Sequence, residues 1–306
     1  MFKFILYRLL QTLLVLWVIV TVTFFLVRLA PGDPFSAERS MPSHVKERLM
    51  QHYGLDQPAW VQYGNYVSSL LQGDLGPSYT QSRNVNQILA QTFPVSLELG
   101  AWALLIALCI GLPVGVVAAV YRNTRLDYVP MSMAMVGICL PTFVLGPLLA
   151  LFFGVWLNWF NVSGWFGPHD RVLPALTIGL VYAAVIARIT RGGMLEILTR
   201  DFIRTARAKG VPFHTIIFKH TLRGGLLPVV SYMGPALAGV ISGSFVVETI
   251  FQIPGLGREF VSSAFNRDYT LVLGTVIVYA ALITLANLLV DIVQVLLNPR
   301  IRFEDS

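Results

Sequence analysis

Basic side chains gather in one stretch of the chain, 188–223, where eight lysines and arginines occur. Cationic groups at helical spacing form ion pairs and hydrogen bonds with acidic surfaces, so the chemistry of this stretch is docking. Two sets of side chains fall on opposite faces of a helical wheel: Leu195, Leu198, Phe202 and Ala206 on one, and Arg200, Arg204 and Arg207 on the other. Gly210 and Pro212 should end this helix. We expect a short helix with the membrane on one side and a cytoplasmic partner on the other.

The residue types that catalyse reactions do not form a recognisable constellation. Ser242 and Ser244 flank a glycine but lack the pattern of a nucleophile elbow, and no histidine falls within a predicted span. Neither the histidines nor Cys109 and Cys139 have metal-ligand spacing, and no phosphate-binding loop is present. We therefore expect a protein without catalytic residues, metal or cofactor, in which any use of ATP falls to a partner chain.

The composition is that of a membrane protein. Apolar residues make up 55% of the 306 and charged residues 12%, whereas a soluble domain carries about a quarter charged residues. A helix crosses the bilayer with about 20 apolar residues. Six stretches meet this length: Leu9–Leu26, Leu97–Tyr121, Pro130–Trp156, Val172–Ala187, Leu226–Val247 and Leu271–Leu297. The pattern predicts an all-α membrane protein with six transmembrane helices, the first an uncleaved anchor.

The distribution of basic residues predicts the orientation. Fourteen of the 22 lysines and arginines fall on the side of the termini and the basic stretch, which should therefore be cytoplasmic. This asymmetry accounts for the net charge of +6, so a nucleic-acid partner is not needed. The predicted organisation has four parts: an anchor helix (1–30), an extracytoplasmic subdomain of short helices (31–96), a five-helix core with a coupling segment (97–297, with 188–225), and a cytoplasmic tail (298–306).

Small and polar residues in the last two spans admit two interpretations. The fifth span supplies candidates for the wall of a translocation path: Ser231, Gly234, Ala238, Ser242 and Gly243. Gly239 and Gly243 also form a G-x-x-x-G pattern that permits close helix packing, and both interpretations stay open. In the last span Thr284, Asn287, Asp291 and Gln294 form a polar stripe. We interpret this stripe as interhelical hydrogen bonding rather than as a proton relay.

Several segments of the chain resemble one family. The sequence from Arg204 to Gly210 resembles the EAA loop of ABC importer permeases in its peptide-transporting branch, where Ala206 and Gly210 match. Arg204 stands where the general pattern has glutamate, and His220 and Arg223 replace its later isoleucine and proline. Further segments that resemble the same branch are Leu29–Pro34, Tyr53–Pro58, Gly73–Gly76, Glu248–Phe251, Pro254–Gly257, Asn266–Tyr269 and Asn298–Arg302. Ser231–Ala236 favours the B subunits of oligopeptide permeases.

This resemblance implies a type I ABC importer permease of the bacterial inner membrane that translocates oligopeptides. Its implied partners are a homologous permease C subunit in a heterodimer, two ATP-binding subunits, an extracytoplasmic peptide-binding protein and membrane lipid. The implied ATPase-coupling residues are Phe202, Arg204, Thr205, Ala206, Arg207, Lys209 and Gly210. A same-family permease for dipeptides, glutathione or nickel remains the alternative. An ion-coupled secondary transporter is less expected, because internal repeats and charges near mid-bilayer are missing from the sequence.

Overall fold

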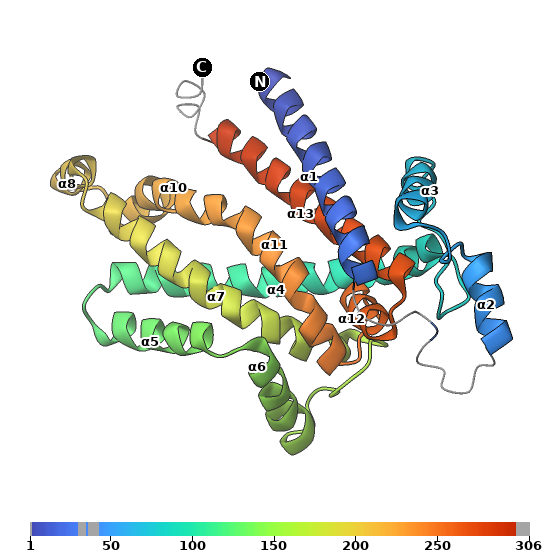
Figure 1. Cartoon of the computed structure of the whole chain (residues 1–306). Helices are drawn as coiled ribbons and strands as arrows, with labels where there is room; N and C mark the ends of the chain where they lie inside the picture. The colour runs from blue at the N-terminus through green and yellow to red at the C-terminus, as the bar shows by residue number, and fades with distance from the viewer. Residues whose placement is uncertain (1, 30–34, 36–42, 298–306) are drawn as a thin grey trace. The chain divides into compact units, whose positions relative to one another are not determined.

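The computed structural model describes residues 2–29, 35 and 43–297, which fold into helices joined by turns (Figure 1). Within these ranges the pairing of extended backbone is limited to one isolated bridge between Pro77 and Asn84. Five helices are long and apolar enough to cross a membrane, and a bent helix pair makes six if it counts as one span. The all-α membrane class is confirmed.

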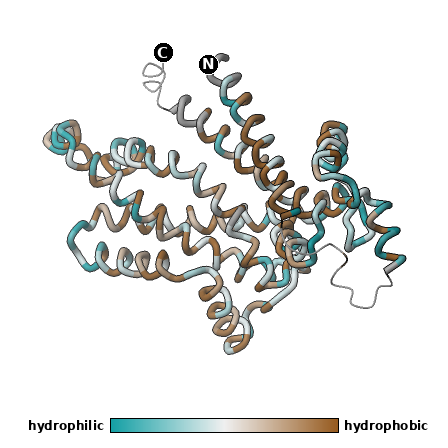
Figure 2. The backbone as a smooth tube through the Cα atoms, viewed as in Figure 1, coloured by the Kyte–Doolittle hydropathy of each residue, from teal (hydrophilic) through white to brown (hydrophobic). Residues whose placement is uncertain are grey.

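The candidate spans are joined by shorter helices. The long helices and the bent pair are α1 (Phe2–Leu29), α4 (Val85–Val120), α5 (Arg125–Cys139), α6 (Thr142–Leu149) with η1 (Ala150–Trp156), α7 (Pro168–Leu198), α11 (Leu227–Ile250) and α13 (Tyr269–Leu297). The shorter ones are α2 (Ser43–His52), α3 (Ala59–Leu71), α8 (Asp201–Ala208), α9 (Phe213–Thr215), η2 (Ile216–Thr221), α10 (Leu222–Gly225) and α12 (Leu256–Asn266). Hydrophilic residues dominate α2 and α8, whereas hydrophobic ones dominate α1 and α4 (Figure 2).

The third predicted span is not one straight helix. The axis bends by 109° between α5 and the pair formed by α6 and η1. The break falls at Leu140 and Pro141. Leu140 is extended because proline disfavours helical geometry in the residue before it, and Pro141 itself lacks an N–H donor. The apolar run from Pro130 to Trp156 therefore folds as two helical pieces, which composition alone did not reveal.

Two predicted spans are parts of longer helices. The helix predicted from Leu97 begins at Val85, so it extends twelve residues into the predicted outer subdomain. The helix predicted to end at Ala187 continues to Leu198 and includes eleven residues of the predicted coupling segment. Thr199 and Arg200 then separate it from α8. The expectation of a single helical face from Leu195 to Ala206 is therefore wrong.

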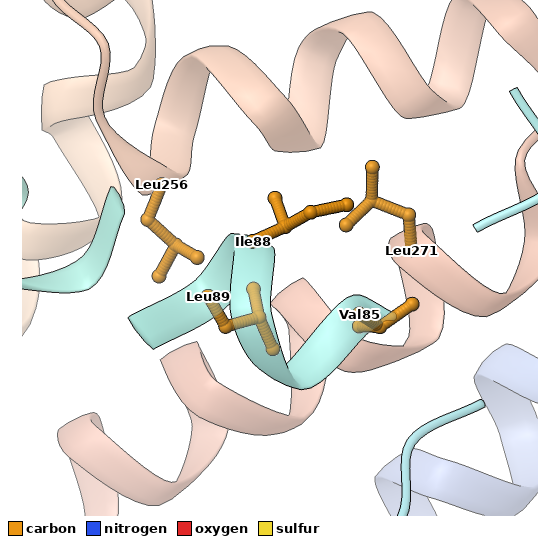
Figure 3. Close-up of a cluster of buried hydrophobic side chains, with 5 residues drawn as sticks. All are labelled: Val85, Ile88, Leu89, Leu256 and Leu271. Atoms are coloured by element: carbon orange, nitrogen blue, oxygen red, sulfur yellow. The ribbon is translucent and has the colours of Figure 1, made fainter. Parts of the chain in front are cut away.

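The chain divides into two compact units, and the first comprises Met1–Ser96 and Pro254–Thr284. Residues 254–284 of this unit lie within the range predicted for the permease core (97–297). The first unit has a buried cluster contributed by α4, α12 and α13: Val85, Ile88, Leu89, Leu256 and Leu271 (Figure 3). The loop before α4 is held by the buried carboxylate of Asp268, which accepts hydrogen bonds from the Ser78 hydroxyl at 2.5 Å and the Thr80 hydroxyl at 2.8 Å. Segments distant in sequence therefore fold as one body.

The second unit comprises Leu97–Ile253 and Leu285–Ser306, and α7 forms its centre. Gly111 and Gly115 of α4 lie against the backbone of α7. A Cβ atom added at Gly111 would lie 2.7 Å from the carbonyl oxygen of Ala183. One added at Gly115 would lie 2.5 Å from the carbonyl oxygen of Ala187. Only glycine permits this approach, which is the small-residue packing typical of helices in lipid. The helix α7 is therefore held along much of its length.

Candidate docking site

The helix α8 is a separate two-turn element. Arg200 is extended just before it, and the Thr199 hydroxyl donates to the carbonyl oxygen of Glu196 at 2.8 Å, closing the end of α7. Asp201 lies in the first turn of α8 and Arg207 in the last. Both charges therefore complement the helix dipole. The sequence thus encodes a stop, a break and a restart at this point.

The end of α8 has the glycine cap that the sequence predicts. Gly210 has a φ of +73°. Its N–H donates to the carbonyl oxygen of Arg207 at 3.0 Å, and the N–H of Val211 donates to the carbonyl oxygen of Ala206 at 3.1 Å. These two bonds form a Schellman motif, in which a left-handed residue satisfies the last carbonyl groups of the helix. A Cβ atom at Gly210 would meet no atom within 4 Å, so backbone conformation, not space, favours glycine here.

Most of the predicted coupling residues lie on the exposed surface of α8. Phe202 is 52% exposed, whereas the neighbouring Ile203 is fully buried. Ala206 is half-buried. The other predicted residues are exposed: Arg204, Thr205, Arg207, Lys209 and Gly210. The structure therefore buries Ile203 rather than Phe202 against the protein, because the break before α8 separates the rotation of this helix from that of α7.

The inward side of this region packs on protein rather than on lipid. Ala119, Met194 and Ile217 form a buried cluster, and Leu195 and Leu198 pack against it. Behind it, a Cβ atom at Gly193 of α7 would collide with the carbonyl oxygen of Gly225 in α10. Helix α8 contacts η2, and η2 packs with α4, α7 and α10, so these elements form the platform of α8.

Arginine side chains around α8 remain accessible. Arg204 lies 3.6 Å from Asp201, but their side chains are 79% and 98% exposed, so this pair contributes little stability. Arg200 pairs with Glu196 at 2.5 Å, again in an exposed position. Neither pair removes its guanidinium from solvent. The site can therefore offer cationic groups and an aromatic ring to an acidic, partly apolar partner.

One arginine counted in the basic stretch has a different role. Arg191 donates from Nε to Asp127 Oδ1 at 2.6 Å and from Nη2 to Asp127 Oδ2 at 2.8 Å. The carboxylate also accepts the N–H of Asn123 at 2.9 Å and is 1% exposed. This bidentate pair fixes the start of α5 to α7. Sequence reasoning missed it, although a lone acid beside Arg122 and Arg125 was a usable signal.

The predicted path residues have different surroundings along α11. Gly234 is buried, and its Cβ would lie 3.2 Å from Oδ1 of Asn287. Ser231 is exposed and Ala238 half-buried, while a Cβ at Gly243 would meet nothing within 4 Å. The side chain of Ser242 lies outside the described residues. The structure therefore places Gly234 in a helix contact and leaves space beside Gly243.

Polar residues of the last span are only partly described. The Thr284 hydroxyl donates to the carbonyl oxygen of Ala280 within its own helix at 2.8 Å. Asn287 faces the small residue Gly234 of α11. The side chain of Asp291 lies outside the described residues, as does the segment from Asn298. The stripe thus contains one contact between helices and one bond within a helix.

Comparison with known proteins identifies the family. The model of the binding-protein-dependent transport system inner membrane component matches residues 111–303, and the model of its N-terminal part matches residues 1–100. The chain belongs to this family. It is a multi-pass protein of the bacterial inner membrane and a permease component of an ABC transporter.

Curated relatives match over almost the whole length. The oligopeptide transport system permease protein OppB of Salmonella typhimurium is 47% identical over 99% of this chain and 100% of the relative. OppB of Escherichia coli is 46% identical over the same shares. The dipeptide transport system permease protein DppB of Bacillus subtilis is 44% identical over 93% of each chain.

Solved structures confirm the permease fold. A chain of the MetNI methionine ABC transporter in an inward-facing conformation aligns with a TM-score of 0.58 at 20% identity, covering 69% of this chain and 97% of that one. An amino acid ABC transporter aligns with a TM-score of 0.52 at 17% identity, covering 70% and 94%. These alignments support the type I permease architecture expected from the sequence.

Proposed function

We propose that this chain is the permease subunit of an ATP-driven importer that translocates oligopeptides delivered by an external binding protein. The observation that carries this proposal is identity of 46–47% with two OppB proteins over their full length. The partners are a homologous permease C subunit, two ATP-binding subunits and an extracytoplasmic peptide-binding protein. ATP hydrolysis takes place in the ATP-binding subunits.

In this proposal α8 is the element that docks onto an ATP-binding subunit. Phe202 gives an apolar contact, and Arg204 and Arg207 give charged contacts on the exposed surface. The buried Ile203 anchors the helix to the permease. ATP-driven closure of the partner subunits would then move α8 together with its platform. That motion would bias the spans between inward-open and outward-open states.

The assembly and the substrate class can be tested together. A tagged chain should co-purify with two ATP-binding subunits, a second permease and a binding protein. The reconstituted complex should import tripeptides and pentapeptides only with ATP and the binding protein. Import driven by an ion gradient by the chain alone would refute the proposal. Import limited to dipeptides would favour the alternative of a dipeptide permease, which the identity with DppB supports.

We also propose that both termini and α8 are cytoplasmic. Ser68 in α3 and Thr199 next to α8 are exposed and suit labelling after conversion to cysteine. The background should lack Cys109 and Cys139, which are exposed on the isolated chain. Ser68→Cys should react with an impermeant maleimide in sealed cells, and Thr199→Cys only after permeabilisation. Labelling of Thr199→Cys in sealed cells would overturn this orientation.

The translocation path is proposed to follow the face of α11 that carries Ser231, Ala238 and Ser242. These positions are seven and four residues apart, so they share a helical face. Ser231 is exposed and Ala238 half-buried in the isolated chain. Small side chains there would leave room for peptides of varied sequence. Gly243 adds room beside this face, whereas the burial of Gly234 supports a packing role.

A further inference from the structure

A polar cavity of about 350 Å³ lies in the first unit, between the end of α1, helices α2 and α3, and the segment after them. Its lining includes a guanidinium, amides and phenol groups: Arg28, Gln57, Gln62, Asn65, Tyr66 and Tyr79. The docking and path residues discussed above belong to other segments. This cavity therefore needs an explanation of its own.

The cationic group in this cavity lacks a described counter-charge. A guanidinium has five N–H donors. Arg28 donates from Nε to Oε1 of Gln62 at 2.9 Å and from Nη1 to the carbonyl oxygen of Phe24 at 3.3 Å. It also stacks on the Phe24 ring at 3.5 Å. Among the described residues no carboxylate forms an ion pair with Arg28, so both a positive charge and N–H donors remain for a ligand.

Two phenol groups add further donors to the cavity wall. The Tyr66 hydroxyl is buried and has no hydrogen-bond partner among the described residues. Burial raises the pKa of Tyr66 well above its ordinary value and raises the pKa of Tyr79 to about 12, so both keep their protons at neutral pH. A cation beside protonated hydroxyl groups is the donor set that binds an anion.

The position of Arg28 along α1 indicates which anion can reach it. Arg28 lies 21 residues beyond Tyr7, the start of the candidate span, which corresponds to about 30 Å of helix. That length matches the hydrocarbon thickness of a bilayer, so Arg28 lies at the level of the lipid headgroups. Leu26 and Leu29 beside it are 60% and 78% exposed and suit contact with acyl chains.

We propose that this cavity binds the phosphate of a phospholipid headgroup, with Arg28 as the cationic partner and the hydroxyl of Tyr79 as a further donor. A bound headgroup would tie α2 and α3 to the membrane surface. Inorganic phosphate presents the same chemistry without acyl chains, so the test must separate these two sources.

The test is native mass spectrometry of the purified full transporter, titrated with phosphatidylglycerol, phosphatidylcholine, diacylglycerol and inorganic phosphate. Phosphatidylglycerol and phosphatidylcholine should bind, and diacylglycerol should not, because it lacks the phosphate. Arg28→Gln should weaken phospholipid binding about tenfold, since a charge-assisted hydrogen bond is lost. Arg83→Gln is the matched control, because Arg83 is exposed in the same unit, donates to Gln91 and does not line the cavity.

Tyr79→Phe separates ligand binding from folding. This variant removes one hydroxyl from the cavity lining and keeps the ring with its contacts to Tyr53 and Tyr269. It should leave thermal stability unchanged while weakening phospholipid binding several-fold. Equal binding of diacylglycerol and phosphatidylglycerol would overturn the proposal. So would unchanged phospholipid binding by Arg28→Gln or by folded Tyr79→Phe. Binding of inorganic phosphate through Arg28 as tightly as phosphatidylglycerol would also overturn it, because the acyl chains would then contribute nothing.

Discussion

Substitution of Gly210 tests whether the geometry at the end of α8 determines docking. Gly210 has a φ of +73°, and its N–H takes part in the cap that closes the helix. In Gly210→Val the added Cβ atom meets no atom within 4 Å, so a collision of the Cβ contributes nothing. The cost is the left-handed backbone alone, about 1–2 kcal/mol for an ordinary residue and at the upper end for a β-branched one.

That cost translates into a measurable change in docking. About 2 kcal/mol lowers the population of the capped conformation by roughly 30-fold relative to competing ones. The two capping bonds, from Gly210 to Arg207 and from Val211 to Ala206, would then be lost. The direction in which the chain leaves α8 would change as well. Docking of an ATP-binding subunit should weaken, while the spans still insert because none of them contains Gly210.

The assay is co-purification of the ATP-binding subunits together with peptide-stimulated ATP hydrolysis. Gly210→Val should reach the membrane at the normal level yet lose most of both signals. Gly210→Asn is the graded control, because asparagine tolerates the left-handed region and should keep most activity. Gly192→Val controls for side-chain size, since a Cβ at Gly192 also meets nothing and no positive φ is present. Normal assembly and transport by Gly210→Val would refute the reasoning.

Four further substitutions test the docking surface, the packing of α11, the path and the buried ion pair. Ala206→Glu should weaken ATPase docking and peptide-stimulated hydrolysis, and normal values would contradict the assignment of this position to the docking surface. Gly239→Leu should lower the thermal midpoint of the complex, because Tyr182 occupies the space that the new side chain would need. Ser242→Trp should leave assembly intact but reduce pentapeptide uptake more than tripeptide uptake. Loss of the folded complex, or unchanged uptake of both peptides, in Ser242→Trp would remove Ser242 from the path. Asp127→Asn should destabilise the complex by roughly 3 kcal/mol. This is the lower end of the cost of breaking a buried ion pair, because Arg191 keeps contact with water. An unchanged thermal midpoint of the complex would contradict this prediction.

The sequence by itself determined the membrane class, the approximate places of the spans and the end of α8. These features follow from local properties: apolar length, the helix-stopping pair at Gly210 and Pro212, and the short motifs that pointed to the permease family. The left-handed conformation of Gly210 is confirmed because it depends only on the residues around it. Such properties need no knowledge of the tertiary contacts.

Only the tertiary structure decided which faces are buried and which charges are paired. Ile203 rather than Phe202 faces inward because two non-helical residues restart α8 at a new rotation, and a wheel drawn through the break cannot include that change. Asp127 and Arg191 are 64 residues apart, so their pairing depends on how α5 packs against α7. The bend at Pro141 was visible as a residue, but its 109° angle depends on the packing of both helical pieces. Long-range packing sets these features, and sequence spacing within one segment does not encode it.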